Sequence, residues 1–394
     1  MPHLTREVDV SITHFQGMEG LESLRDVWNE IVSGMIRRHF FHLWEWHHSY
    51  MKCLEPDPQS FLYFLFTKGK TPVAIFPLRV TKVFIGGMQF KALASPSHNH
   101  MLLGDLICNR DALHLPLFQL LSKYLRNQKK TWDLIQLFRL LEDACAIHMI
   151  QKHPPAMFVQ THDGCCDFID TTGEYESFVS GLSKNFKRSL KRAKQYLNKL
   201  QGVEFSFTHN GSTLEEKLDV FMDVEASGWK GVLGSGTAIK LHPNLRCFYR
   251  TLTSTLSACG RVSINTITAE GKCLAAQLCI LLDNTAYIVK IGYDEGYKRY
   301  APGNLLVDLF IKRSIEDCTI ENINLLTDAE WHVDWRPKSY NKSTLYIYNT
   351  TPAGLIGFVI LKSYPILKKY YEGYIQPHLP RRIQEKIGGF SRET

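Results

Sequence analysis

The stretch from residue 286 to residue 318 has the residue types and order of a phosphate-binding turn. An apolar run, AYIVKIGY, leads through a charged loop into Pro302-Gly303-Asn304, and apolar residues then recur at helical spacing. The start of a helix offers unpaired backbone N–H groups and the positive end of the helix dipole. Gly303 lets a ligand approach the backbone closely, and Lys298 and Arg299 add positive charge. The stretch therefore predicts a pyrophosphate cradle, with an ordinary strand-to-helix turn as the alternative.

Side chains that could accept a proton lie in two further segments. Asp328, Glu330 and His332 follow the strand-like run ENINLL (321–326), and sites in α/β proteins usually lie past the carboxyl ends of strands. Glu225, four residues before Trp229, is the other candidate. A positioned carboxylate or imidazole can serve as a general base. The alternatives are a solvated loop for the first segment and a salt bridge from Glu225 to Lys230 for the second.

A basic helix is expected at about 176–200. Its apolar residues recur at steps of three and four and form one face. The rest is positively charged, with no acidic residue between Ser183 and Gly202. A solvated face is one interpretation. Binding of an anionic partner, such as a nucleotide phosphate, a polyanion or tRNA, is the other.

The elements that must position these residues repeat one order along the chain: helices, three strands, a helix and a strand. In the first pass the helices are expected at 19–33, 39–53 and 111–126, and the strands at 61–66, 72–80, 88–94 and 132–138. In the second pass the helices are expected at 176–200, 213–226, 243–257 and 304–316, and the strands at 203–207, 261–267, 273–282, 286–293 and 321–326. Three strands joined by short turns predict an antiparallel meander, and the following strand–helix–strand unit predicts a parallel crossover.

Length and composition fit two lobes with ordinary globular cores. The chain has 394 residues, 44% hydrophobic and 22% charged, and a net charge of +7. We place the boundary near 150–170, where HPP (153–155) and DGCC (163–166) interrupt the periodicity. The 10 cysteines lack a repeated CxxC pair, so we interpret them as reduced thiols of a cytosolic protein without a metal site. The first residues carry charges and no long apolar run, so no signal peptide is expected.

Several segments, in order, resemble the CelD/BcsL-type acetyltransferases of the GNAT superfamily, whose wider relatives are the FemABX-like tandem GNAT proteins. GYDEGYKRYAPGNLL resembles the CoA-binding turn of that family. LSKNFKRSLKRAKQYL, EASGWKG, CLAAQL and LLTDAEWHVDW resemble its basic helix, its acidic-to-tryptophan segment, a strand with a polar residue, and its strand end with an acidic loop. PVAIFPLRV and residues 97–106 resemble parts of its first lobe.

The resemblance implies an α/β (α+β) fold of two GNAT-like lobes, each a mixed, mostly antiparallel sheet flanked by helices. It implies an N-terminal lobe at 1–165 without a CoA site and a C-terminal lobe at 166–394 that takes acyl-CoA, most simply acetyl-CoA. The acceptor would be an amine or hydroxyl of a small molecule or saccharide. The implied cofactor residues are Lys298, Arg299, Gly303, Asn304, Leu305 and Ile291. The implied acceptor-binding residues are Trp229, Gln277, Lys290 and Tyr293. The implied base is Glu330, then Asp328, with His332 and Glu225 as further candidates.

The chain departs from the family pattern at two places. Counting from Arg299, the glycine positions of the general GNAT phosphate signature hold Pro302 and Asn304. Trp331-His332 stands where relatives often have Tyr-Lys. Two alternatives therefore stay open: a FemABX-like transferase that uses aminoacyl-tRNA, and a catalytically idle scaffold in polysaccharide or envelope assembly.

The C-terminal segment 363–390 mixes aromatic and basic residues. Packing across its own domain is the expectation, and peripheral contact with a membrane is the alternative. Pro365, Pro377 and Pro380 argue against one long amphipathic helix there.

Overall fold

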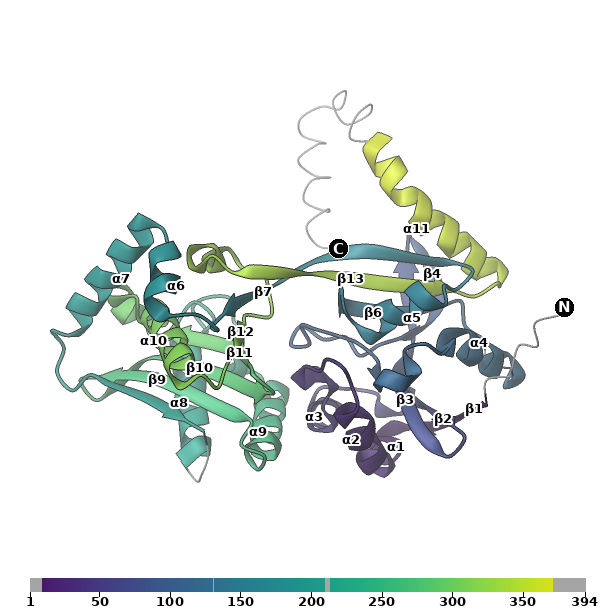
Figure 1. Ribbon diagram of the computed structural model, residues 1–394, viewed down its shortest axis with the longest axis horizontal. Coiled ribbons are helices and arrows are strands. Elements are labelled where there is room, and N and C mark those ends of the chain that lie inside the picture. The colour runs from purple at the N-terminus through teal and green to yellow at the C-terminus, as the bar shows by residue number, and fades with distance from the viewer. Residues whose placement is uncertain (1–8, 130, 210–212, 371–394) are drawn as a thin grey trace.

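The computed structural model describes residues 9–129, 131–209 and 213–370 (Figure 1). The strands are β1 (Val10–Gln16), β2 (Phe61–Lys68), β3 (Thr71–Ile85), β4 (Met88–Ala94), β5 (Ile107–Cys108), β6 (Leu134–Leu141), β7 (Phe158–Asp170), β8 (Glu204–Thr208), β9 (Val262–Ala269), β10 (Lys272–Leu282), β11 (Thr285–Tyr293), β12 (Asn322–Asn324) and β13 (Lys338–Tyr348). The helices are α1 (Gly17–Ser23), α2 (Arg25–Ser33), α3 (Trp44–Cys53), α4 (Leu117–Asn127), α5 (Cys145–Lys152), α6 (Tyr175–Gly181), α7 (Lys184–Leu197), α8 (Thr213–Ser227), α9 (Pro243–Ser257), α10 (Pro302–Asp317) and α11 (Pro352–Tyr370). Short 3-10 turns include η5 (Glu295–Tyr300) and η6 (Glu330–Trp335).

Both expected meanders are present. Strands β2, β3 and β4 pair antiparallel in sequence, and β4 then pairs in parallel with β6 after the crossover through α4. Strands β9, β10 and β11 repeat this order, and β11 pairs in parallel with β12 after the crossover through α10. The mixed, mostly antiparallel α/β class expected from the sequence is therefore confirmed.

One sheet of 13 strands joins the two lobes in the described part of the chain. The long strand β7 pairs with β12 at its second-lobe end, and β13 pairs with both β7 and β6. Figure 1 shows these two strands as a ribbon that runs from one lobe to the other. The expected boundary at residue 165 falls inside β7, so the lobes share a strand there. The division into 1–165 and 166–394 stays a prediction.

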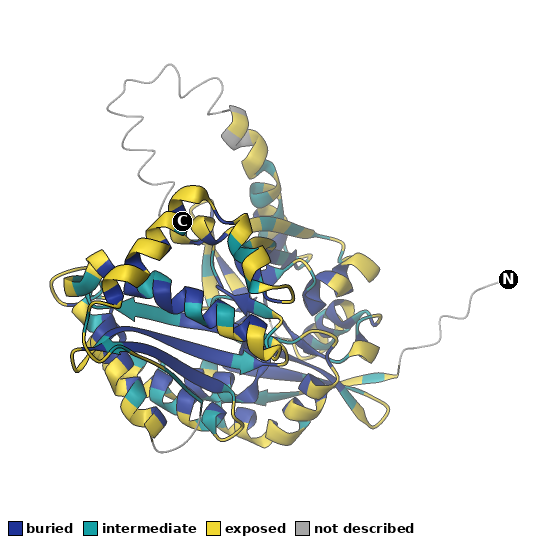
Figure 2. Ribbon diagram, turned by 60° about the vertical axis from the view of Figure 1, so that its left-hand side comes forward, coloured by how far each residue is buried: buried dark blue, intermediate teal, exposed yellow. Residues whose placement is uncertain are grey.

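Helices cover the second-lobe part of the sheet on both faces. Apolar side chains of α7 and α10 pack on one face, in a core that includes Leu306 and Phe310. α8 and α9 pack on the other face, in a core that they share with α1, α2 and α3 of the first lobe. Figure 2 shows the strands largely buried between helices whose outer faces are exposed. The shared core fixes the two lobes relative to each other across their facing helices.

Two helix predictions need correction. The basic segment forms two helices, because the chain is extended at Leu182 and Ser183, whose hydroxyl accepts the N–H of Phe186 and caps α7. Helix α11 continues through Pro365, so this proline does not end it. The helix packs against β13, β7, β3 and β4, but Tyr364 and Ile366 in its last part are exposed, so packing of the 363–390 segment across its own domain stays a prediction. Residues 371–394, which contain Pro377 and Pro380, lie outside the described residues. Within the described ranges no helix combines the length and apolar character needed to cross a bilayer.

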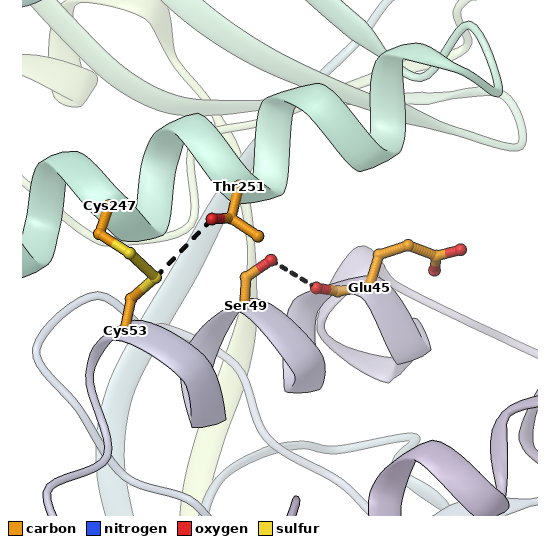
Figure 3. The surroundings of a disulfide bond; sticks show 5 residues. All are labelled: Glu45, Ser49, Cys53, Cys247 and Thr251. Atoms are coloured by element: carbon orange, nitrogen blue, oxygen red, sulfur yellow. Dashed lines mark hydrogen bonds between the residues drawn. A yellow bond between two sulfur atoms is a disulfide. The ribbon is translucent and has the colours of Figure 1, made fainter.

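The expectation that all cysteines are reduced thiols is wrong for one pair. Cys53, at the end of α3, forms a disulfide with Cys247 of α9, and the two Cα atoms are 5.7 Å apart (Figure 3). The pair is 194 residues apart in sequence and joins helices of different lobes. No sequence pattern predicts this disulfide, because the two sulfur atoms are brought together only by the tertiary packing of α3 on α9.

We predict that this disulfide stabilises the joined lobes. Cross-linking so long a loop restricts the unfolded chain, and its loss should cost about 2 to 5 kcal/mol. Thermal unfolding of Cys53→Ser should show a lower Tm than the parent, and a reductant should lower the Tm of the parent but not that of the variant. Cys259→Ser, which removes an exposed free thiol, is the matched control. Equal Tm values for the parent and Cys53→Ser would contradict the prediction.

Candidate functional site

The second-lobe sheet opens where β11 separates from β12. The two strands pair in parallel only from Thr285 to Tyr287, whereas β11 continues along β10 to Tyr293. β12 stops early because the Asn324 side chain accepts the N–H of Leu326 at 2.8 Å and Leu326 adopts a left-handed φ of 65°. Beyond Tyr287, one edge of β11 therefore faces a gap instead of a neighbouring strand.

A β-bulge lies at the point of separation. The register of β11 against β10 shifts between Leu278 and Cys279, which pair with Lys290 and Ile288, so Val289 has no partner on β10. A bulge bends its strand and redirects the side chains that follow it. Ile291 and Tyr293 consequently pack toward α10, in the core that α10 shares with α7.

A pocket of about 490 Å³ occupies this opening. Its lining residues come from α8 and the following loop, from the end of β11, from η5, from the start of α10 and from η6. They are Glu225, Gly228, Trp229, Lys230, Ile291, Gly292, Tyr293, Lys298, Ala301, Pro302, Gly303, Asn304 and Trp331. Glu225 supplies the carboxylate among these residues, and the indoles of Trp229 and Trp331 are partly exposed.

The first turn of α10 forms one end of the pocket. Ala301 precedes the helix with φ 44° and ψ 49°, and Pro302 is the first helical residue. Proline has no N–H, and the N–H groups of Gly303 and Asn304 come too early in the helix for an intrahelical partner. A Cβ at Gly303 would lie 3.4 Å from Tyr293 Cδ1 and 3.9 Å from Ile291 Cδ1. A larger side chain there would extend into the space between the helix start and β11.

Glu225 is held at the opposite side of the pocket. Its side chain is 2% exposed, and it accepts hydrogen bonds from Lys230 Nζ at 3.0 Å and from the N–H of Ile239 at 2.9 Å. Lys230 Nζ also lies 3.5 Å from the carbonyl oxygen of Ile291, on the separated part of β11. A Cβ at Gly292 would lie 2.8 Å from Glu225 Cα, so only glycine permits this approach of α8 to the strand. The salt bridge to Lys230 that the sequence offered as an alternative exists, and it lies in the pocket wall.

The acidic loop does not reach the pocket through its acidic side chains. Glu330 is exposed, and Asp328 Oδ2 accepts the N–H of Cys165 at 3.1 Å. His332 is buried, and its Nδ1 lies 2.9 Å from Asp167 Oδ2. Burial lowers the pKa of His332, and the Asp167 carboxylate opposes this effect. The His332–Asp167 contact holds η6 against β7. As a result Trp331, which lies between Glu330 and His332 in the sequence, forms part of the pocket wall.

The predicted residues divide into those that line the pocket and those that do not. The pocket brings together Ile291, Lys298, Gly303, Asn304, Trp229, Tyr293 and Glu225. Arg299 instead lies over the Tyr300 ring, and Leu305 and Gln277 are buried in the core. Lys290 lies on β11 beside the pocket but does not line it. No group of three or more His, Cys, Asp or Glu side chains suited to a metal ion occurs in the part of the chain that the structure describes.

Sequence reasoning missed three contributions to the pocket. Lys230 was considered only as a partner of Glu225, Gly292 was not named as a site residue, and Trp331 was noted only as a departure from the family pattern. The segment EASGWKG, which contains Glu225 and Lys230, carried a usable signal. A glycine at the end of an apolar strand also marks a close backbone approach.

Comparison with solved structures identifies a shared fold. The chain is similar to FemX, with a TM-score of 0.57, 7% identity, and 88% of this chain and 99% of that chain covered. It is also similar to a conserved protein of unknown function from Bacteroides thetaiotaomicron, with a TM-score of 0.50, 14% identity, and 83% and 97% of the two chains covered. At these identities the likeness shows the fold alone. Comparison with curated proteins found no match.

Comparison with family models adds a match in sequence. Residues 184–335 match the family described as Acetyltransferase (GNAT) domain. The matched range begins at α7 and ends with η6, so it contains the separation of β11 from β12, the start of α10 and every residue that lines the pocket. The CelD/BcsL type in particular is not distinguished by this match. Over these residues the second lobe is therefore similar in sequence to acetyltransferase domains of the GNAT type.

Proposed function

We propose that the protein transfers an acyl group, most simply acetyl, from acyl-CoA to an amine or hydroxyl of a small-molecule or saccharide acceptor. The observation that carries the proposal is the pocket at the separation of β11 from β12, which ends on the first turn of α10. The free N–H groups of Gly303 and Asn304, with the positive end of the helix dipole, suit a pyrophosphate. Lys298, whose side chain is 74% exposed and whose Nζ lies 3.8 Å from Glu295 Oε2, adds a cation to the lining of the same pocket.

The open edge of β11 would hold the rest of acyl-CoA. The pantetheine arm would lie along residues 289–292, and backbone N–H groups of this edge would polarise the thioester carbonyl. The acceptor nitrogen or oxygen then attacks the carbonyl carbon, the carbon–sulfur bond breaks, and CoA leaves as a thiol after it takes up a proton. The acceptor gives up one proton in the same sequence. Since the thioester is already activated, the main tasks of the protein are to position the reactants and to accept that proton.

Glu225 is our choice for the proton acceptor. It is the carboxylate that lines the pocket, and hydrogen bonds from Lys230 and from the N–H of Ile239 hold it in place. The Asp328 carboxylate accepts a hydrogen bond from the backbone N–H of Cys165, and the His332 ring contacts the Asp167 carboxylate. Glu330, ranked first from the sequence, is exposed on η6 outside the pocket lining. The choice among these residues is a proposal that substitution can test.

A FemABX-like transferase would use aminoacyl-tRNA instead of acyl-CoA. The exposed basic residues of α7 are the feature that favours this alternative. Two of them have partners: Lys194 pairs with Asp308, and Lys187 donates to the carbonyl of Ser180. α7 also packs against η5, the turn that leads into α10, so a basic helix there also suits the nucleotide end of CoA. Binding of acetyl-CoA separates these alternatives from each other and from an idle scaffold.

We predict that acetyl-CoA stabilises the protein in a thermal-shift titration and that Gly303→Val abolishes this stabilisation. Valine would project its branched side chain between α10 and β11, where the pyrophosphate has to approach the backbone. Gly173→Val, at an exposed position with no atom within 4 Å of the new Cβ, is the control and should keep the shift. A shift retained by Gly303→Val would place CoA elsewhere. A shift given only by aminoacyl-tRNA would favour the alternative.

We predict that Glu225→Gln lowers turnover by about 100-fold or more, which is the usual contribution of a positioned base, while acetyl-CoA still binds. The loss should become smaller at high pH, because the acceptor then loses its proton without help. Hydrolysis or transfer can be followed through the released CoA thiol.

Glu330→Gln and Asp328→Asn serve as the comparison and should keep near-parent turnover. If Glu330→Gln instead shows the large loss and Glu225→Gln does not, the base lies in the acidic loop as first expected.

A further inference from the structure

One side of α11 is apolar and faces away from the rest of the described chain. Leu355, Ile356, Val359 and Ile366 are spaced so that they fall on one side of a helix, and we call these four residues the outer stripe. Between 45% and 72% of each of these side chains is exposed. Figure 1 shows that the last turns of α11 extend beyond the sheet of the first lobe. A gathered apolar surface of this kind marks a site of interaction.

The opposite side of α11 fixes the helix on the first-lobe sheet. A Cβ at Gly357 would lie 3.0 Å from Tyr348 Cε1 and 3.1 Å from Phe90 Cε1, so glycine lets the helix lie close to β13 and β4. Gly357 and Val359 are about 200° apart around the helix, because each residue of an α-helix turns the chain by about 100°. The contacts with the sheet therefore leave the outer stripe facing away from it.

The charges of α11 have one sign. Its sequence contains Lys362, Lys368 and Lys369 and no aspartate or glutamate. Lys362 and Lys369 are exposed, and they lie three residues after Val359 and Ile366 respectively. Residues three apart are neighbours on a helix surface, so both of these lysines lie at the edge of the outer stripe. The side of α11 that faces away from the sheet is therefore both apolar and positively charged.

The described neighbours of α11 do not neutralise these lysines. Lys362 Nζ lies over the Phe358 ring, 5.1 Å from the ring centre, and within the described residues neither Lys362 nor Lys369 forms an ion pair. Asp133 lies at the start of the helix, where its carboxylate accepts the hydroxyl of Thr351 at 3.1 Å. Thr351 precedes Lys362 by about 16 Å along the helix axis, which is beyond the screening length in physiological salt. The lysines are thus free to bind an external anion.

Three occupants could cover the outer stripe: a second copy of the chain, the segment 371–394, or a lipid surface. Two copies joined through the same stripe would bring lysines toward lysines, with no acidic residue on α11 to pair with them. The segment 371–394 carries four basic and three acidic residues, a net charge of +1 (4 − 3), so it offers no excess of negative charge. A bilayer with anionic headgroups offers an apolar interior and negative charge together, and it is the occupant that the observations favour.

We infer that α11 binds the surface of an anionic lipid bilayer through the outer stripe, with Lys362 and Lys369 at the level of the headgroups. The helix lies in the plane of the interface, and its apolar side chains enter the boundary between headgroups and acyl chains. The long lysine side chains keep their charges among the headgroups while their stems cover apolar surface. The inference is independent of the proposed function, because it uses no residue that lines the acyl-CoA pocket.

Co-sedimentation of the full chain with lipid vesicles tests the inference. The protein should bind vesicles of equal parts phosphatidylcholine and phosphatidylglycerol more tightly than vesicles of phosphatidylcholine alone, and added salt should weaken this binding. Val359→Asp should lower the partition coefficient about tenfold or more, because a carboxylate would enter the apolar boundary. Replacement of Lys362 or of Lys369 by glutamine should lower it by about fivefold each. Equal binding to the two kinds of vesicle, or to the parent and Val359→Asp, would overturn the inference.

Leu233→Asp is the matched control, because it places the same charge at a fully exposed apolar position in the loop after α8. This variant should bind anionic vesicles as the parent does. Loss of binding by Leu233→Asp, with binding kept by Val359→Asp, would place the membrane contact in the second lobe and overturn the inference.

Two measurements without lipid separate the other occupants. Val359→Asp should keep the Tm of the parent, since the Val359 side chain is exposed and aspartate has a helix propensity close to that of valine. A clearly lower Tm would show that the chain covers its own outer stripe. Light scattering should give the same mass for the parent and for Val359→Asp. A parent dimer that Val359→Asp converts to a monomer would show that a second copy covers the stripe, and either result would overturn the inference.

Discussion

The structure of the second lobe depends on one constraint: a strand that leaves its neighbour exposes backbone groups that must find other partners. β11 leaves β12 after Tyr287 but stays paired with β10 to Tyr293, so its free edge is held rigidly on one side and open on the other. The bulge at Val289 and the early end of β12 at Leu326 both belong to this separation. Each feature that we assign to the donor site lies at that edge or against it.

The separation is stabilised from two sides. On one side Gly292 allows α8 to approach closely, which brings Glu225 and Lys230 to the strand. On the other side Asp167, near the end of β7, accepts from the Ser339 hydroxyl and contacts His332, while its backbone bonds with Leu325 and Thr327. β7 and β13, which are part of the sheet in both lobes, thus link the position of this loop to the first lobe. The lobes also share a hydrophobic core and a disulfide, which hold them in a fixed position relative to each other.

Sequence patterns were sufficient to predict the helices and strands that are determined by residues close together in the sequence. The two meanders, α9 and the turn into α10 follow from apolar periodicity and from Pro302-Gly303. β7 and β13 were not predicted, because they pair with each other across a long sequence separation and FVQTHDGCCDFID shows no clean alternation. The site residues likewise divide into those that the sequence could predict and those that it could not. The cradle residues are contiguous in sequence and could be predicted, whereas the ranking of Glu330 assumed a loop that faces the pocket. The His332–Asp167 contact orients η6 differently, and no local pattern encodes a contact between residues 165 apart.

The central claim is that acyl-CoA lies along the free edge of β11 and ends on the first turn of α10. Amide hydrogen exchange with and without acetyl-CoA measures this most directly, because it reads the backbone groups themselves. The account predicts slower exchange in 288–293 and 303–306, with no change at the start of α4, the corresponding crossover helix of the first lobe. Protection confined to the start of α4, or unchanged exchange in both β11 and α10 when acetyl-CoA is bound, would contradict it.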